Sequence, residues 1–139
     1  MLANIASQYA TIIGMIKVLV VEDKEIIRRA IVDELVLDKF GVSEAADGEE
    51  ALAKVISEKP DIIILDILLP KMNGLDVFKK IRSNPKIADT KVVMLTNIEA
   101  DDKMIKEIVS LNPCFYLNKA SLSLSELPDR INACFNNQA

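Results

Sequence analysis

The sequence contains no histidine and only 2 cysteines among its 139 residues. A zinc site needs more nitrogen and sulfur ligands than this chain has, so any bound metal must be held by oxygen atoms. Oxygen ligands indicate Mg²⁺, Mn²⁺ or Ca²⁺. No secretory signal accompanies Cys114 and Cys134, so we expect small buried side chains in a reducing compartment rather than a disulfide.

Charge is missing from the start of the chain, where Lys17 is the first charged residue, and basic clusters are missing from the rest. A signal peptide needs a positive region ahead of its apolar stretch, and the uncharged segment is also too short and polar to span a bilayer. With a net charge of −4, the chain lacks the basic footprint that nucleic acid requires. We expect a cytoplasmic protein that binds neither nucleic acid nor membrane directly.

The residues that are present suit one globular domain. Of the chain, 50% is hydrophobic and 27% is charged, which provides both a core and a soluble surface. We predict a domain over residues 16–137 and an N-terminal extension over residues 1–15. Two interpretations of the extension stay open: an appendage or a misassigned start ahead of Met15, or a short helix that docks on the domain or on a partner.

Short apolar runs that do not alternate with polar residues recur along the chain. Such runs are typical of strands buried on both faces of a parallel sheet. The segments between them carry apolar residues at helical spacing. The order β-α repeated five times predicts an α/β fold with a doubly wound parallel sheet, whose ligand site lies beyond the carboxyl ends of the strands. Strands are expected at residues 18–21, 62–65, 92–95 and 114–117, with a weaker one at residues 42–46.

Local signals indicate where helices begin and end. Gly41 is expected to end the first helix, which carries its apolar spacing over residues 26–35. Asp47 is a candidate N-cap for the second helix. Pro128 falls in the first turn of the last helix if that helix begins near Ser125, where a missing backbone N–H is tolerated.

Polar side chains follow the ends of the strong strands. Glu22 and Asp23 follow the first, and Asp66, Thr96 and Lys119 lie at the ends of the three others. Three neighbouring acids repel one another at neutral pH, and a hard divalent cation such as Mg²⁺ offsets that repulsion. A carboxylate beside Mg²⁺ and a lysine is able to attack phosphorus and form an acyl phosphate.

Each residue alone also has a plainer interpretation. Asp23 is a candidate cap for the first helix, and Lys119 is a candidate surface residue. Together they favour a metal and phosphate site, because five polar residues rarely end four buried strands at one edge by accident.

The same segments resemble the receiver domain of two-component response regulators, over about residues 16–135. The resemblance implies a flavodoxin-like (βα)₅ fold with strand order 2-1-3-4-5. Its motifs are VLVVED ending at Asp23, ADGEEAL ending at Leu52, DIIILDILLPKMNG ending at Gly74, VMLT ending at Thr96 and YLNK ending at Lys119.

The resemblance also implies a phosphorylation site. Asp66 would be the phosphoacceptor, Asp23 a direct ligand of Mg²⁺, and Glu22 a ligand through water. The backbone carbonyl of Leu68 would complete the protein's share of the metal site, and Mn²⁺ is an alternative ion.

The remaining implied roles concern the phosphoryl group and the switch. Lys119 would pair with the phosphoryl group, Thr96 would hydrogen-bond to it, and Tyr116 matches the switch aromatic of the family. The phosphoryl donor would be a histidine kinase or a phosphotransfer protein. The response would alter a face built from the fourth helix, the fifth strand and the fifth helix, which binds a partner protein or a second copy of the chain.

These features favour a stand-alone receiver that phosphorylates and dephosphorylates itself at Asp66, rather than a conventional enzyme. Two alternatives stay open. A pseudo-receiver would use the same fold for protein contacts alone, without phosphorylation. A phosphatase of the haloacid-dehalogenase type would need a second aspartate two residues after the first, where this chain has Leu68.

Two departures from the family pattern, and two apolar residues near the site, lead to expectations of their own. Ala120 follows the lysine where the family has proline, which predicts a trans peptide bond and a shifted loop. Asn97 stands where the family has a small residue, and it either crowds the site or hydrogen-bonds a phosphoryl oxygen. Leu68 and Ile98 are apolar at positions that flank the attacking water, which predicts slow self-dephosphorylation.

Overall fold

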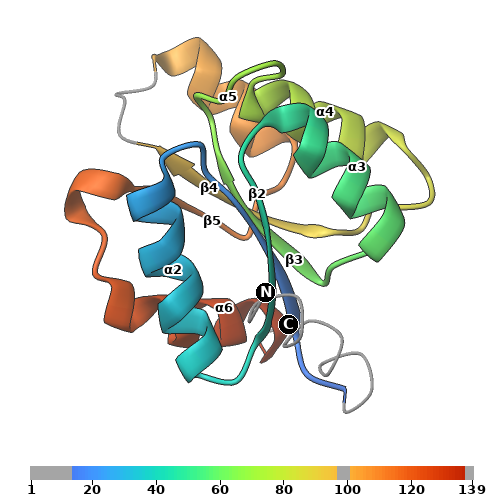
Figure 1. Ribbon diagram of the computed structural model, residues 1–139. Helices are drawn as coiled ribbons and strands as arrows, with labels where there is room; N and C mark the ends of the chain where they lie inside the picture. Colours follow the sequence, from blue (N-terminus) through green and yellow to red (C-terminus); the bar gives the residue numbers. More distant parts are fainter. Residues whose placement is uncertain (1–13, 97–100, 137–139) are drawn as a thin grey trace.

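The computed structural model describes residues 14–96 and 101–136. A five-stranded parallel sheet with the order β2-β1-β3-β4-β5 forms its centre (Figure 1). The predicted strand order is therefore confirmed. The strands are β1 Lys17–Val21, β2 Gly41–Ala45, β3 Ile62–Asp66, β4 Lys91–Thr96 and β5 Phe115–Asn118.

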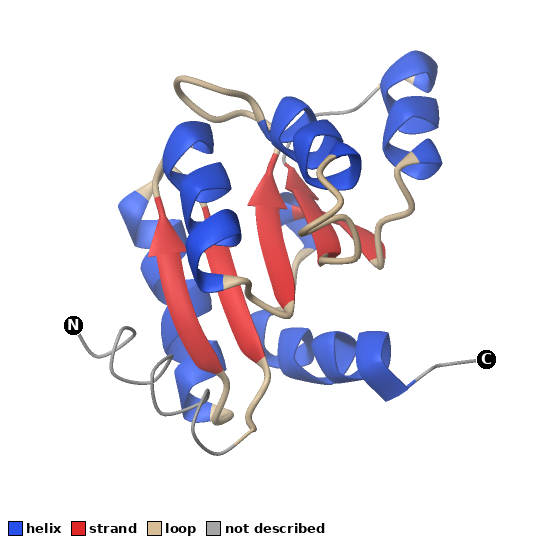
Figure 2. Ribbon diagram, turned by 90° about the vertical axis from the view of Figure 1, so that its right-hand side faces the viewer, coloured by secondary structure: helices blue, strands red, loops and turns tan. Residues whose placement is uncertain are grey.

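Helices cover both faces of the sheet, as Figures 1 and 2 show. Helices α2 and α6 pack on one face around a core that includes Ile31 and Ile131. Helices α3, α4 and α5 cover the other face around Phe78 and Ile108. The predicted doubly wound α/β fold is thus confirmed. The helices are α2 Glu25–Leu37, α3 Gly48–Glu58, α4 Gly74–Ser83, α5 Asp102–Ser110 and α6 Leu127–Asn136, with short 3₁₀ turns at η1 Lys119–Ser121 and η2 Leu124–Glu126.

The continuous apolar runs form buried strands, with one exception at the edge of the sheet. In β3 every residue is buried, because helices cover both of its faces. In β5 only Leu117 is buried, and Tyr116 is exposed. The expectation of burial on both faces is therefore wrong for β5. Cys114, one residue before β5, is an exposed free thiol, so the expectation that both cysteines are buried is also wrong.

Three helix-end predictions have clear outcomes. The Asp47 side chain accepts a hydrogen bond from the backbone N–H of Glu50 at 2.8 Å, which confirms it as the N-cap of α3. Pro128 lies in the first turn of α6, as predicted. Gly41 does not end α2, because that helix stops at Leu37 and Gly41 begins β2. The left-handed conformation in this turn is instead adopted by Lys39, with φ of 70°.

Three other sequence predictions concern residues outside the described part. The interpretations of the N-terminal extension fall on residues 1–13, and the role of Asn97 and the contribution of Ile98 fall on residues 97–100. Of the helices in the described ranges, none combines the length and apolar character needed to cross a membrane.

Candidate functional site

The predicted site residues meet at the carboxyl edge of the sheet. Glu22 directly follows β1, Asp66 ends β3 and Thr96 ends β4, and all three are buried. Asp23 lies beside Glu22 and is exposed. Carboxylate oxygens of Glu22, Asp23 and Asp66 lie within 4.8 Å of one another. Three acids at such separations form an oxygen-donor set that suits a hard divalent cation.

Lys119 places a positive charge between two of these acids. It follows β5, and its Nζ donates a hydrogen bond to Oδ2 of Asp66 at 3.0 Å. The same ammonium pairs with Oε1 of Glu22. Burial alone would lower the pKa of Lys119, but its contacts with the carboxylates of Glu22 and Asp66 outweigh this effect and raise the pKa. The lysine therefore remains an ammonium at the site and is not a surface residue.

The loop that carries Lys119 begins with a 3₁₀ turn. The side chain of Asn118 accepts a hydrogen bond from the backbone N–H of Ala120 at 2.8 Å. Peptide bonds in the described ranges are all trans, so the trans bond expected before Ala120 is confirmed.

Glu22 is the most enclosed of the acids, with 0% of its surface exposed. Its Oε2 accepts a hydrogen bond from the backbone N–H of Lys24 at 3.0 Å. Its Oε1 has no hydrogen-bond partner of ordinary geometry and lies against the Lys119 ammonium. Burial raises the pKa of Glu22, against the lowering effects of the Lys119 ammonium beside it and of the hydrogen bond from the Lys24 backbone N–H. A buried carboxylate in this position fits a bound cation, because extra positive charge offsets its desolvation.

The plainer interpretation of Asp23 is wrong. The N-cap of α2 is Lys24, without a capping side-chain hydrogen bond, and the helix begins at Glu25. Asp23 therefore does not cap the helix, and its carboxylate faces the acidic cluster instead.

Two glycines allow the loop after Asp66 to pack closely against its neighbours. A Cβ atom on Gly74 would lie 1.9 Å from the backbone oxygen of Asp66, and one on Gly48 would lie 1.8 Å from that of Met72. The N–H of Gly74 donates to the carbonyl of Ile67 at 2.7 Å. The backbone between Asp66 and α4 is thus fixed from both sides. The Leu68 side chain on this loop is 54% exposed, and the metal-binding role of its carbonyl stays a prediction.

Tyr116 lies on the edge strand β5, shortly before the site lysine in the chain. It is 38% exposed, and partial burial raises the pKa of its hydroxyl. Ile105 and Val109 of α5 are also exposed apolar side chains, 45% and 65% exposed respectively. The predicted output face therefore presents apolar groups to solvent.

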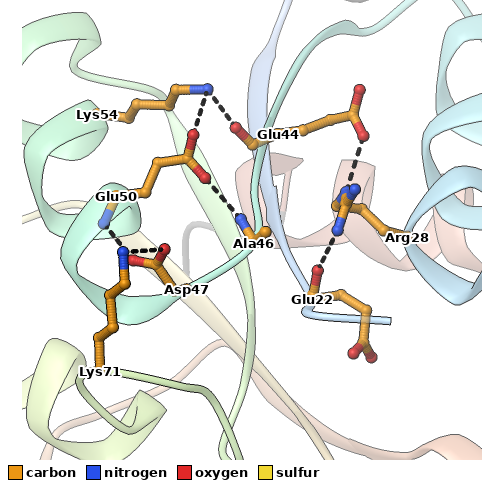
Figure 3. A network of polar contacts seen from close by, with 8 residues as sticks. All are labelled: Glu22, Arg28, Glu44, Ala46, Asp47, Glu50, Lys54 and Lys71. Carbon is orange, nitrogen blue, oxygen red and sulfur yellow. Dashed lines mark hydrogen bonds and ion pairs between the residues drawn. The ribbon is translucent and has the colours of Figure 1, made fainter. Parts of the chain in front are cut away.

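A polar network beside the site was not predicted from the sequence (Figure 3). Nη1 of Arg28 donates to the backbone carbonyl of Glu22 at 2.7 Å, and its Nε pairs with Oε1 of Glu44 at 3.0 Å. Lys54 donates to the carbonyl of Glu44. In the sequence Arg28 is one of several charged residues on the exposed side of a helix, and only the pairing of β1 with β2 brings Glu44 beside it.

A cavity of about 550 Å³ lies at the opposite, amino edge of the sheet and includes Arg82 and Lys91 in its lining. Arg82 does not provide a free anion-binding group there. Its guanidinium donates to the backbone carbonyls of Leu111, Ala88, Thr90 and Asn112. In this cavity the Arg82 guanidinium is thus occupied by hydrogen bonds to the backbone of neighbouring loops. The cluster of acids with Lys119 lies at the carboxyl edge of the sheet.

Comparison with known proteins agrees with this geometry. The sequence matches the response regulator receiver domain family over residues 18–132. The alkaline phosphatase synthesis transcriptional regulatory protein PhoP of Bacillus subtilis is 39% identical over 95 residues, which are 68% of this chain and 38% of PhoP. The transcriptional regulatory protein LiaR of the same organism is 31% identical over 121 residues, or 86% of this chain and 56% of LiaR.

Solved structures show the same fold. The chemotaxis response regulator CheY4 of Vibrio cholerae superposes with a TM-score of 0.77 at 31% identity, covering 86% of this chain and 98% of that one. The response regulator domain of Thermotoga maritima CheB gives a TM-score of 0.75 at 29% identity, covering 88% and 97%. This chain spans 38% of PhoP and 56% of LiaR, so the similarity concerns only part of each of those relatives. The chain belongs to the response regulator receiver domain family of two-component signal transduction.

Proposed function

We propose that this receiver domain accepts a phosphoryl group on Asp66 from a phosphohistidine of a histidine kinase or phosphotransfer protein, with Mg²⁺ held by Glu22, Asp23 and Asp66. One observation carries the proposal. The three acids lie within 4.8 Å of one another, and Lys119 reaches the Asp66 carboxylate at 3.0 Å. An acidic pocket that already contains an ammonium beside the nucleophile suits phosphoryl transfer better than a passive contact surface.

The chain's own residues account for the transfer step. A carboxylate oxygen of Asp66 attacks phosphorus, an O–P bond forms, and the N–P bond to the donor imidazole breaks with its electron pair leaving on nitrogen. Lys119 neutralises charge on the phosphoryl oxygens, and the Thr96 hydroxyl donates a hydrogen bond to one of them. When bound, Mg²⁺ neutralises further negative charge on the transferring group. Glu22 and Asp23 would hold that ion, and the carbonyl of Leu68 would add a ligand.

Phosphorylation then changes the output face. The phosphoryl group adds roughly −1.5 to −2 charges and strong acceptor oxygens. Movement of Thr96 toward these oxygens would leave room into which Tyr116 turns. The exposed position of Tyr116 on the edge strand supports this role, because a turn inward would exchange solvent contact for burial. We propose that the face of α5, β5 and α6 thereby gains or loses a protein partner or a second copy of the chain.

Slow self-dephosphorylation is the expected consequence of an apolar rim. The Leu68 side chain lies two residues after Asp66 and is 54% exposed there, where it would hinder approach of water. An aspartyl phosphate that disappears within seconds would contradict this part of the proposal.

Acetyl phosphate tests the proposal directly. We expect wild-type protein with acetyl phosphate and Mg²⁺ to gain one phosphoryl group by intact mass measurement, and Asp66→Ala to gain none. Omission of Mg²⁺ should also prevent the adduct. The pseudo-receiver alternative predicts no adduct in any sample, and an adduct of equal yield in both proteins would refute the assignment of Asp66.

A further inference from the structure

Both backbone groups of Glu22, the first of the two acids after β1, are hydrogen-bonded to residues outside the acidic cluster. The N–H of Glu22 donates to the carbonyl of Ala45 at 3.1 Å and so extends the pairing of β1 with β2 by one residue. The carbonyl of Glu22 accepts the hydrogen bond of 2.7 Å from Nη1 of Arg28. That carbonyl belongs to the peptide unit whose amide nitrogen is part of Asp23. The orientation of this peptide unit therefore sets the position of the Asp23 Cα atom, from which the side chain projects.

Arg28 itself is fixed in place. It lies near the start of α2, its side chain is only 16% exposed, and its Nε pairs with Oε1 of Glu44 on β2 at 3.0 Å. The planar guanidinium thus spans a strand end and a neighbouring strand with two directed hydrogen bonds. A lysine has a single ammonium and lacks this fork geometry.

Arg28 does not neutralise the Glu22 carboxylate. Figure 3 shows the guanidinium on the carbonyl side of Glu22, with the carboxylate pointing away from it. The partner of the carboxylate is Lys119, and the charge of Arg28 is already balanced by Glu44. The arginine therefore acts on the backbone of the acidic pair and not on its charge.

We infer that Arg28 is a positioning residue for the cation site, which orients the peptide between Glu22 and Asp23 and so sets the affinity of the acidic cluster for Mg²⁺. This inference rests on the proposed function, since it concerns the same cation. Groups that orient metal ligands without touching the metal change affinity by about 10- to 100-fold. An effect of about tenfold is expected here, because Arg28 holds a ligand's backbone rather than its carboxylate.

The sign of the effect separates positioning from simple electrostatics. Removing a cation near three carboxylates should strengthen the binding of a divalent cation if charge alone matters. Removing a positioning group should weaken it. The variant Arg28→Met thus gives opposite results under the two explanations, and the charge-neutral double variant Arg28→Met/Glu44→Gln removes the net charge change altogether.

The experiment is a calorimetric titration of the full chain with Mg²⁺ at constant ionic strength. We expect Arg28→Met and the double variant each to bind about tenfold more weakly than wild type, with Arg28→Lys between them and wild type. Lys54→Met is the matched control, because it removes a cation that contacts Glu44 but not Glu22, and its affinity should equal that of wild type. Urea unfolding in the presence of a chelator measures any loss of stability in the same proteins.

A spectroscopic signature reports on the peptide itself. In the metal-free protein, the amide resonance of Asp23 should shift in Arg28→Met and stay in place in Lys54→Met. Unchanged or tighter Mg²⁺ binding by Arg28→Met would overturn the inference. If Arg28→Met does not fold, Arg28→Lys keeps the charge but lacks the fork geometry, and unchanged Mg²⁺ binding by that variant would overturn the inference instead. Wild-type protein that takes up no Mg²⁺ would instead contradict the proposed function.

Discussion

The ammonium of Lys119, which follows β5, pairs with the carboxylate of Glu22, which follows β1, although β3 and β4 lie between these strands in the sheet. The same ammonium is 3.0 Å from Asp66 at the end of β3. Lys119 therefore spans most of the carboxyl edge and gives the buried acids the positive charge they need before a cation binds. Loss of this charge should therefore lower the stability of the metal-free folded protein.

Lys119→Met is expected to destabilise the metal-free protein by about 3 kcal/mol, because removal of one partner leaves a buried charge without compensation. Urea unfolding in a chelator measures the loss. Saturating Mg²⁺ should restore much of it, since the cation binds the folded state and replaces the missing charge. The exposed Lys106 on α5 offers the control, and Lys106→Met should change little. Equal losses in the two variants would contradict the compensating role of Lys119.

Asp47 should contribute stability at neutral pH and lose that contribution in acid. The hydrogen bond from the Glu50 backbone N–H lowers its pKa below the ordinary value. A group whose pKa is lower in the folded state stabilises above its ordinary pKa of about 3.9 and stops doing so as the pH falls through the lower, folded value. Asp47→Ala should therefore cost about 1 kcal/mol at neutral pH, and this difference should shrink in acid. Urea unfolding across that range tests it.

Asp47→Asn is the control for this titration. An asparagine side chain caps a helix without a titrating carboxyl, so its stability at neutral pH should resemble that of wild type. The part of the acid-induced loss that arises from Asp47 should be absent. The assignment fails if wild type and Asp47→Asn lose stability along the same curve.

Gly74→Ala should disturb the phosphorylation site, and Gly48→Ala should disturb mainly stability. A Cβ on Gly74 would collide with the backbone of Asp66 itself, whereas one on Gly48 would collide with Met72 on the far part of the loop. Each substitution should cost about 1–3 kcal/mol. Rates of phosphorylation by acetyl phosphate should fall clearly further for Gly74→Ala. Equal rates in the two variants would mean that the loop absorbs the displacement before it reaches Asp66.

Tyr116 should become less accessible when Asp66 is occupied. The chain has no tryptophan and 2 tyrosines, so in a Tyr9→Phe background the tyrosine fluorescence reports on Tyr116 alone. Beryllofluoride with Mg²⁺, a stand-in for the phosphoryl group, should reduce quenching by acrylamide, because the ring turns inward. The same addition should have no effect after Asp66→Ala. Unchanged quenching in the Tyr9→Phe protein would contradict the switch role.

Much of the site could be predicted because parallel strands bring their carboxyl ends to one edge. Asp66 and Thr96 end buried apolar runs, and Glu22 directly follows one. A place at the end of such a run therefore predicts that the side chain lies at the carboxyl edge of the sheet. The same logic placed Lys119 at the rim, despite the departure from the family pattern at Ala120.

The wrong predictions concern features that depend on where a segment lies in the folded sheet, which its local sequence pattern does not specify. The run at residues 114–117 is as apolar as the central strands, but β5 is an edge strand with little cover, which leaves Cys114 and Tyr116 exposed. The apolar character of a run does not indicate whether the strand lies at the centre or at the edge of the sheet. The prediction of a helix end at Gly41 is wrong because glycine suits both a left-handed turn and the start of a strand, and here Lys39 adopts the positive φ.

The contact of Arg28 with Glu44 could not be predicted from local pattern, because 16 positions separate the two residues in the sequence. It depends on the register in which Val20 lies beside Glu44 and Val21 beside Ala45. Register and side-chain direction follow from the packed sheet, so a positioning group of this kind becomes visible only in the structure.

Reduction with borohydride tests the central claim most directly, since it converts an aspartyl phosphate to homoserine at the residue that carried the phosphoryl group. After incubation with acetyl phosphate and Mg²⁺, peptide mapping by mass spectrometry should find homoserine in place of Asp66, and without Mg²⁺ it should find none. Homoserine in place of Asp23 or of another acid, or a phosphoryl adduct that yields no homoserine, would contradict the account.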